Sequence, residues 1–189
     1  MINKVFILAG GGGNRIKLGQ KQNIKAFIDI NGEELLERHI RLINEYIKPK
    51  QIYVLITEFY EIFNKYISKY QNVSLLLNDN IKNKSGIELL LAVEKINKKI
   101  DQNEKILISL VDEYFSEDDF KNFSEELKLD NFSLKVAIKK LEFPDEYLKN
   151  YSVTIDEDKS VITSSVEKNQ KILSEYFGTG LICVDKEFT

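Results

Sequence analysis

The chain has 189 residues, of which 43% are hydrophobic and 30% are charged, and its net charge is -3. This composition predicts a folded domain, excludes a disordered chain, and argues against a nucleic-acid-binding protein that must neutralise many phosphates. A single cysteine and apolar stretches far shorter than a membrane span exclude a disulfide framework and a membrane protein, so we expect a cytoplasmic protein.

Short apolar strands alternate with amphipathic helices over the first 130 residues. The strands are predicted at Lys4–Ala9, Ile52–Thr57, Val73–Leu77 and Ile106–Val111. Three helices are predicted from apolar residues spaced four, three and four apart: Leu36, Ile40, Ile43 and Ile47, ending at Pro49; Phe59, Phe63, Tyr66 and Tyr70; and Leu89, Val93, Ile96 and Ile100. A fourth helix is predicted after Ser116 and Asp119, which have the spacing of an N-terminal cap. This alternation favours a parallel sheet.

The pattern changes after residue 130, where strands follow one another with little helix between them. These strands are predicted at Leu134–Ile138, Ser152–Ile155, Ser160–Val166 and Phe177–Val184, with a polar hairpin turn over Asp156–Lys159. The fold class is therefore α/β, with a mixed, mainly parallel sheet flanked by helices.

A run of glycines, Gly10–Gly13, directly follows the first strand and precedes Asn14 and Arg15. Consecutive glycines let backbone N–H groups point at phosphate oxygens. The glycine spacing fits neither the dinucleotide-binding motif nor the Walker loop. From the glycines alone, a phosphate-binding loop and a flexible turn are both open.

The first strand and the glycine run form the string Ile7-Leu8-Ala9-Gly10-Gly11-x-Gly13-x-Arg15, which is followed by Lys25 and then by Leu35-Leu36-Glu37-Arg38. This arrangement strongly resembles the start of the sugar-1-phosphate nucleotidylyltransferases, particularly the glucose-1-phosphate thymidylyltransferase-like enzymes. Asn14 and Ile24 stand where that family has Thr and Pro. The resemblance implies a Rossmann-like, GT-A-like nucleotidyltransferase fold of three layers. It also implies that Arg15 and Lys25 are catalytic, and that the nucleotide is bound by Leu8, Ala9, Gly10, Gly11, Gly13 and Asn14.

Further matches occur along the chain. Asp112 ends the fourth strand as a family aspartate does, which implies a ligand for Mg²⁺. Asn78 stands where the family often reads the base, and Gly86 lies in a weak match to a family glycine segment that meets the nucleotide. Glu167, Lys168 and Gly180 lie in segments that resemble the sugar-binding half, with Glu167 facing sugar hydroxyls and Lys168 the acceptor phosphate.

The implied reaction is NTP + sugar-1-phosphate → NDP-sugar + pyrophosphate, by in-line attack on the α-phosphate. The implied organisation is one nucleotidyltransferase domain over 1–189, with a nucleotide-binding half at 1–130 and a sugar-phosphate-binding half at 131–189. Its partners would be a nucleoside triphosphate and a phosphorylated small molecule. Two alternatives stay open, namely a relative acting on phosphocholine or a pterin cofactor, and a non-catalytic regulatory homologue.

The sequence leaves the base, the sugar, a homo-oligomeric state and an additional domain undecided. The family domain continues beyond the strand of Gly180 to a second metal-binding Asp, so we expect either a truncated catalytic domain or a minimal form with one metal carboxylate. His39, the only histidine, is expected to be structural or exposed, and Cys183 is expected to serve packing.

Overall fold

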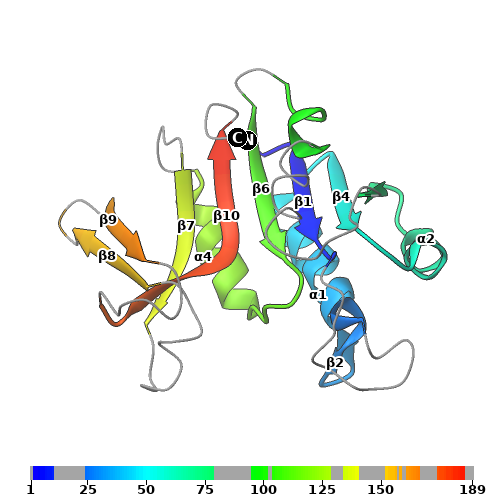
Figure 1. The fold of residues 1–189 in the computed structure, drawn as a ribbon, viewed down its shortest axis with the longest axis horizontal. Coiled ribbons are helices and arrows are strands. Elements are labelled where there is room, and N and C mark those ends of the chain that lie inside the picture. Colours follow the sequence, from blue (N-terminus) through cyan, green and yellow to red (C-terminus); the bar gives the residue numbers. More distant parts are fainter. Residues whose placement is uncertain are drawn as a thin grey trace. The chain divides into compact units, whose positions relative to one another are not determined.

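The computed structural model describes residues 2–10, 24–78, 95–101, 104–128, 134–140, 152–156, 158, 161–166 and 174–185. The chain divides into two compact units (Figure 1). The first comprises Met1–Lys135 and Leu181–Thr189, and the second comprises Val136–Gly180.

The first unit is built on four parallel strands. In spatial order they are β5 (Val73–Leu77), β4 (Gln51–Ile56), β1 (Lys4–Leu8) and β6 (Lys105–Leu110). The last half of β10 (Tyr176–Asp185) pairs antiparallel with β6. All four strands predicted in this part of the sequence are confirmed, and the sheet is mixed and mainly parallel as expected.

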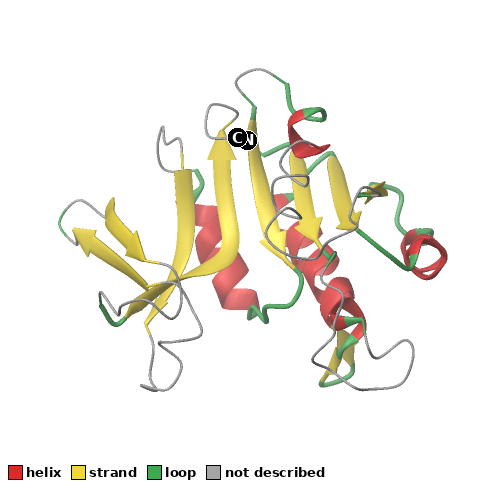
Figure 2. Cartoon of the chain, in the orientation of Figure 1, coloured by secondary structure: helices red, strands yellow, loops and turns green. Residues whose placement is uncertain are grey.

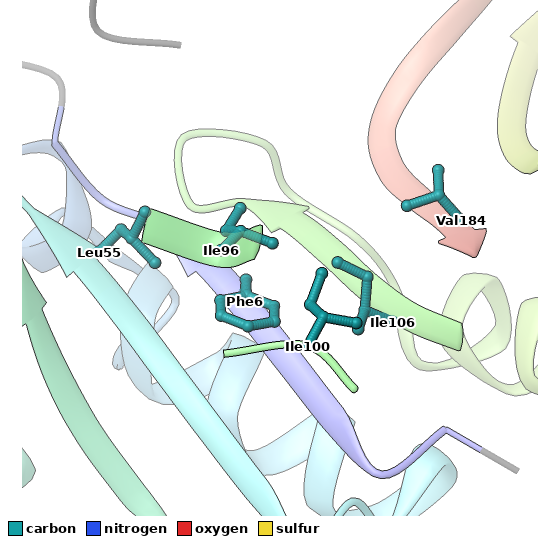
Figure 3. Close-up of a cluster of buried hydrophobic side chains, with 6 residues drawn as sticks. All are labelled: Phe6, Leu55, Ile96, Ile100, Ile106 and Val184. Atoms are coloured by element: carbon teal, nitrogen blue, oxygen red, sulfur yellow. The ribbon is translucent and has the colours of Figure 1, made fainter. Parts of the chain in front are cut away.

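Both faces of this sheet are covered. On one face, Phe6 packs with Leu55 and with Ile96 and Ile100, and all four side chains are buried (Figure 3). On the other face, Ile7 pairs in register with Ser109, whose hydroxyl contacts His39 of a helix. Because neighbours in register point to the same face, that helix lies opposite Ile96 and Ile100. The unit therefore has three layers, which confirms the predicted fold class.

Two of the four predicted helices lie close to their predicted positions, and the helices are drawn in red in Figure 2. The start of the helix predicted over Leu89, Val93, Ile96 and Ile100 lies outside the described residues. α1 (Leu35–Leu42) continues as the π-helix η2 (Ile43–Ile47), and the chain turns at Lys48 with φ of 55° before Pro49. α4 (Glu117–Glu126) has the expected capping box, in which the Ser116 hydroxyl and the Asp119 carboxylate each accept a backbone N–H.

The prediction for the second helix was wrong at its ends. α2 spans Tyr60–Ile67, and it buries Phe63 and Ile67. Phe59 is instead 47% exposed and has the left-handed φ of 61°, so it precedes the helix and is not part of its buried stripe.

A short segment before α1 was not predicted as structure. It contains the 3-10 turn η1 (Lys25–Phe27) and a two-stranded hairpin of β2 (Asp29–Ile30) and β3 (Glu33–Glu34). The hairpin turn is Asn31-Gly32, with φ of 57° and 89°, as such a tight turn requires.

The second unit is a group of antiparallel strands. β8 (Ser152–Asp156) pairs with β9 (Val161–Val166) and with the first residues of β10, and the predicted hairpin is confirmed. The Thr179 hydroxyl of β10 donates to the Ala137 carbonyl of β7 (Leu134–Lys140) over 2.8 Å.

Candidate active site

The carboxyl ends of the four parallel strands lie at one edge of the sheet. Leu8 pairs with Leu55 and Leu110, and Ile56 pairs with Leu77. The Val111 N–H donates to the Leu8 carbonyl over 3.2 Å, which keeps the segment after β6 beside the end of β1. Ligands of open α/β sheets bind at this edge.

Gly10, the first residue of the glycine run, fits closely against the segment after β4. A Cβ on Gly10 would lie 2.8 Å from Cγ2 of Thr57, and the Thr57 hydroxyl donates to the Gly10 carbonyl over 2.7 Å. A side chain at residue 10 would therefore require Thr57 to shift. Sequence reasoning missed Thr57, because a threonine at a strand end carries no signal of its own.

We expect Gly10→Ala to lower the free energy of unfolding by about 1–3 kcal/mol, because the added methyl overpacks against Cγ2 of Thr57. Thr57→Ser in the same background removes Cγ2 and keeps the hydroxyl, so it should recover most of the loss. Urea unfolding of both variants measures this. An unchanged stability of Gly10→Ala would contradict the contact.

Asn78 follows β5 at the same edge and is only 4% exposed. Its backbone N–H donates to the Ile56 carbonyl over 2.8 Å. Within the described part of the chain, its side-chain Oδ1 accepts no hydrogen bond. A buried amide oxygen without a donor costs about 1–3 kcal/mol, so a ligand that supplies an N–H or O–H would be favoured here.

Lys25 and Asp112, which are far apart in the sequence, meet at this edge. The Lys25 Nζ lies 2.5 Å from Oδ2 of Asp112, and the side chains are 34% and 41% exposed. Lys25 is held in place by the next two residues of η1, which are buried; the ring of Phe27 packs 4.9 Å from that of Phe63. Since exposed ion pairs add only about 0–1 kcal/mol to stability, this pair contributes little to holding the fold.

His39 contacts the backbone of the segment that carries Asp112, and it is 1% exposed. One ring nitrogen, Nε2, is 2.9 Å from the Glu113 carbonyl, and the other, Nδ1, is 2.8 Å from the Ser109 hydroxyl. Burial lowers the pKa of His39 to about 4, so the ring is neutral at pH 7. A carbonyl can only accept, so Nε2 carries the proton and Nδ1 accepts from Ser109. The structure thus confirms a structural His39 and shows that it is buried.

The stability of the protein should fall in mild acid because of His39. Its pKa is 6.5 when unfolded and about 4 when folded, so the unfolded chain takes up the proton first and stability is lost as pH falls from 6.5 towards 4. We expect this residue to remove about 2 kcal/mol between pH 7 and pH 5. Urea unfolding at both pH values should show a smaller pH effect in His39→Gln, and an equal effect would contradict the assignment.

Asp112 fits a magnesium ion that arrives with a nucleotide. Among the described residues there is no group of three or more His, Cys, Asp or Glu side chains able to hold a metal. Mg²⁺ in nucleotide enzymes is commonly bound by one or two carboxylates together with substrate phosphates and water. A single carboxylate at the strand edge meets that requirement once phosphate is present.

The other predicted site residues divide into two groups. Leu8, Ala9 and Gly10 lie at the end of β1, while Gly180 is buried within β10 in the second unit. The remaining predicted positions lie outside the described residues; they are Gly11, Gly13, Asn14, Arg15, Gly86, Glu167 and Lys168.

No helix in the described ranges is long and apolar enough to cross a membrane.

Solved structures resemble this chain in fold. The UDP-glucose pyrophosphorylase complexed with UDP-glucose is 15% identical with a TM-score of 0.79, over 99% of this chain and 77% of that one. The inositol-1-phosphate CTP transferase from T. maritima is 18% identical with a TM-score of 0.73, over 98% of this chain and 71% of that one. HddC from Yersinia pseudotuberculosis is 23% identical with a TM-score of 0.71, over 98% and 78%.

The sequence itself gives the assignment to a family. No match is found among curated protein sequences. The sequence profile of the Nucleotidyl transferase family, however, matches residues 4–188, which is nearly the whole chain. The matched region includes both Lys25 and Asp112 and every strand of the sheet. The chain therefore belongs to the nucleotidyl transferase family of enzymes.

Proposed function

We propose that this enzyme transfers a nucleotidyl group from a nucleoside triphosphate to a sugar-1-phosphate and releases pyrophosphate. The observation that carries the proposal is the meeting of Lys25 and Asp112, 2.5 Å apart, at the carboxyl edge of β1 and β6. This ion pair supports the proposal, because the ammonium group could bind phosphate oxygens and the neighbouring carboxylate could bind Mg²⁺. Structural relatives named for UDP-glucose and inositol-1-phosphate chemistry support the choice of a phosphorylated polyol as acceptor.

In this reaction an oxygen of the acceptor phosphate attacks the α-phosphorus, and the bond from that phosphorus to the bridging oxygen of pyrophosphate breaks. The nucleophile is already an anion, so no general base is required. Consistent with this, His39 is buried and both its ring nitrogens are engaged by the protein. Catalysis would then depend on positioning and on neutralising the charge of the phosphates.

Lys25 would hold the α-phosphate, and Arg15 the departing pyrophosphate. Asp112 would hold Mg²⁺, which when bound neutralises charge on the phosphate oxygens. The backbone of Leu8–Gly11, with Gly13 and Asn14, would seat the nucleotide, and Asn78 and Gly86 would meet its base or sugar. In the part of the chain after residue 130, Glu167, Lys168 and Gly180 would receive the acceptor.

A pyrophosphate-release assay tests the proposal and separates it from its alternatives. Each of the four common NTPs and dTTP is combined with a panel of sugar-1-phosphates, with phosphocholine and with a pterin phosphate, in the presence and absence of Mg²⁺. We expect release that requires both Mg²⁺ and a sugar-1-phosphate. Release with phosphocholine or the pterin alone would overturn the sugar assignment. No release with any acceptor would favour a non-catalytic homologue.

A further inference from the structure

Two consecutive side chains of α1 hold the backbone of the segment that carries Asp112. Arg38 Nε donates to the Phe115 carbonyl over 2.8 Å, and His39 Nε2 donates to the Glu113 carbonyl over 2.9 Å. The residue between those carbonyls, Tyr114, lies under the guanidinium of Arg38, whose Cζ is 4.5 Å from the ring centre. The backbone that these two side chains hold therefore begins at Glu113, the residue directly after Asp112.

Each of the two donors is itself fixed by a second contact. Glu33 accepts from Nη1 of Arg38 over 2.9 Å, and hydrogen bonds from Arg41 and Arg38 lower the pKa of Glu33, so it stays ionised. Nδ1 of His39 accepts a hydrogen bond from the hydroxyl of Ser109, which lies in β6 and is fully buried. A side chain fixed at both ends loses little further freedom when it holds a loop.

The ring of His39 is also enclosed by aromatic side chains. It meets the ring of Phe115 at 5.7 Å and that of Phe120 at 6.2 Å, both edge to face. Phe115 belongs to the segment that is held, and Phe120 belongs to α4. The segment from Asp112 to Ser116 has no regular secondary structure, so these contacts substitute for strand or helix hydrogen bonds.

We propose that Arg38 and His39 are positioning residues, which hold the segment of residues 112–115 so that the Asp112 carboxylate is placed for a metal-nucleotide complex. This inference rests on the proposed function. Neither residue would touch the substrate, and both act through backbone carbonyls. Positioning partners of metal ligands contribute about 10–100-fold to metal affinity or activity, so an effect of this size is expected.

The experiment compares variants that keep or remove each donor. His39→Gln can place an amide N–H near the Glu113 carbonyl, whereas His39→Asn reaches only the side of Ser109. Arg38→Met removes the donor to Phe115. Arg41→Met is the matched control, because Arg41 lies on the same helix and also binds Glu33. Within the described part of the chain its hydrogen bonds go to Glu33 and Glu117, and none goes to residues 112–115.

The readout is the affinity of the protein–NTP complex for Mn²⁺, measured by electron paramagnetic resonance without an acceptor. We expect His39→Asn and Arg38→Met to weaken Mn²⁺ binding about 10-fold or more, with His39→Gln and Arg41→Met close to the wild-type protein. Equal affinity in Arg38→Met and Arg41→Met would overturn the proposal, and that pair decides the matter even if His39→Asn fails to fold. Because no turnover is involved, a failure here is distinguishable from a failure to find an acceptor.

Discussion

Lys25→Met is expected to lower turnover by about 10²–10³-fold while leaving the fold intact, because it removes one charge-stabilising donor from the reacting phosphate. The side chain is one-third exposed and contacts Asp112, so its loss leaves no cavity in the core. Steady-state assays with saturating Mg²⁺ and both substrates measure the effect. Lys121→Met removes the same charge from an exposed position on α4 and should retain near-normal turnover.

The same substitution has a second consequence that a purely structural lysine would not have. Removing the ammonium group leaves Asp112 without its cation, so the free protein should bind Mn²⁺ more tightly than the wild-type protein does. Titration in the absence of nucleotide measures this. Near-normal turnover in Lys25→Met, or unchanged metal affinity of the free protein, would contradict the roles given to this pair.

Asp112→Asn is expected to reduce turnover by about 10³-fold, because a bound metal supplies several kcal/mol of transition-state stabilisation and this carboxylate would hold it. Unlike Lys25→Met, it should weaken Mn²⁺ binding both in the free protein and in the nucleotide complex. Asp118→Asn, which changes an exposed carboxylate at the start of α4, is the control and should behave as the wild-type protein. A metal affinity that does not change in Asp112→Asn would exclude this residue as the ligand.

The sequence predicts the strands of the parallel sheet well, because the patterns that indicate them are local. Apolar runs and the capping pair Ser116 and Asp119 depend on near neighbours, so their structure follows from short patterns. The carboxyl-edge rule then brings Asp112 to the end of β1 without any knowledge of side-chain geometry. The salt bridge to Lys25 could not be read from this rule, because η1 is a single turn with no periodic signal.

Spacing alone did not fix the start of the second helix. Phe59 fits the apolar spacing of that helix, yet its left-handed backbone places it before the helix and leaves the residue 47% exposed. The structural role of His39 was expected, and its place on the buried stripe of α1 with Leu36 and Ile40 could also have indicated burial. Its bond to the Glu113 carbonyl, 74 residues away, has no counterpart in the sequence.

The central claim, transfer of a nucleotidyl group to a sugar phosphate, is tested most directly by ³¹P nuclear magnetic resonance of the reaction mixture. The wild-type protein is incubated with Mg²⁺, a sugar-1-phosphate and the NTP that gives the fastest pyrophosphate release. We predict that the sugar-phosphate and NTP signals are replaced by two coupled diphosphate signals and free pyrophosphate, and that Asp112→Asn leaves the starting signals unchanged. Conversion of NTP to nucleotide and phosphate with the sugar-phosphate signal intact would contradict the claim.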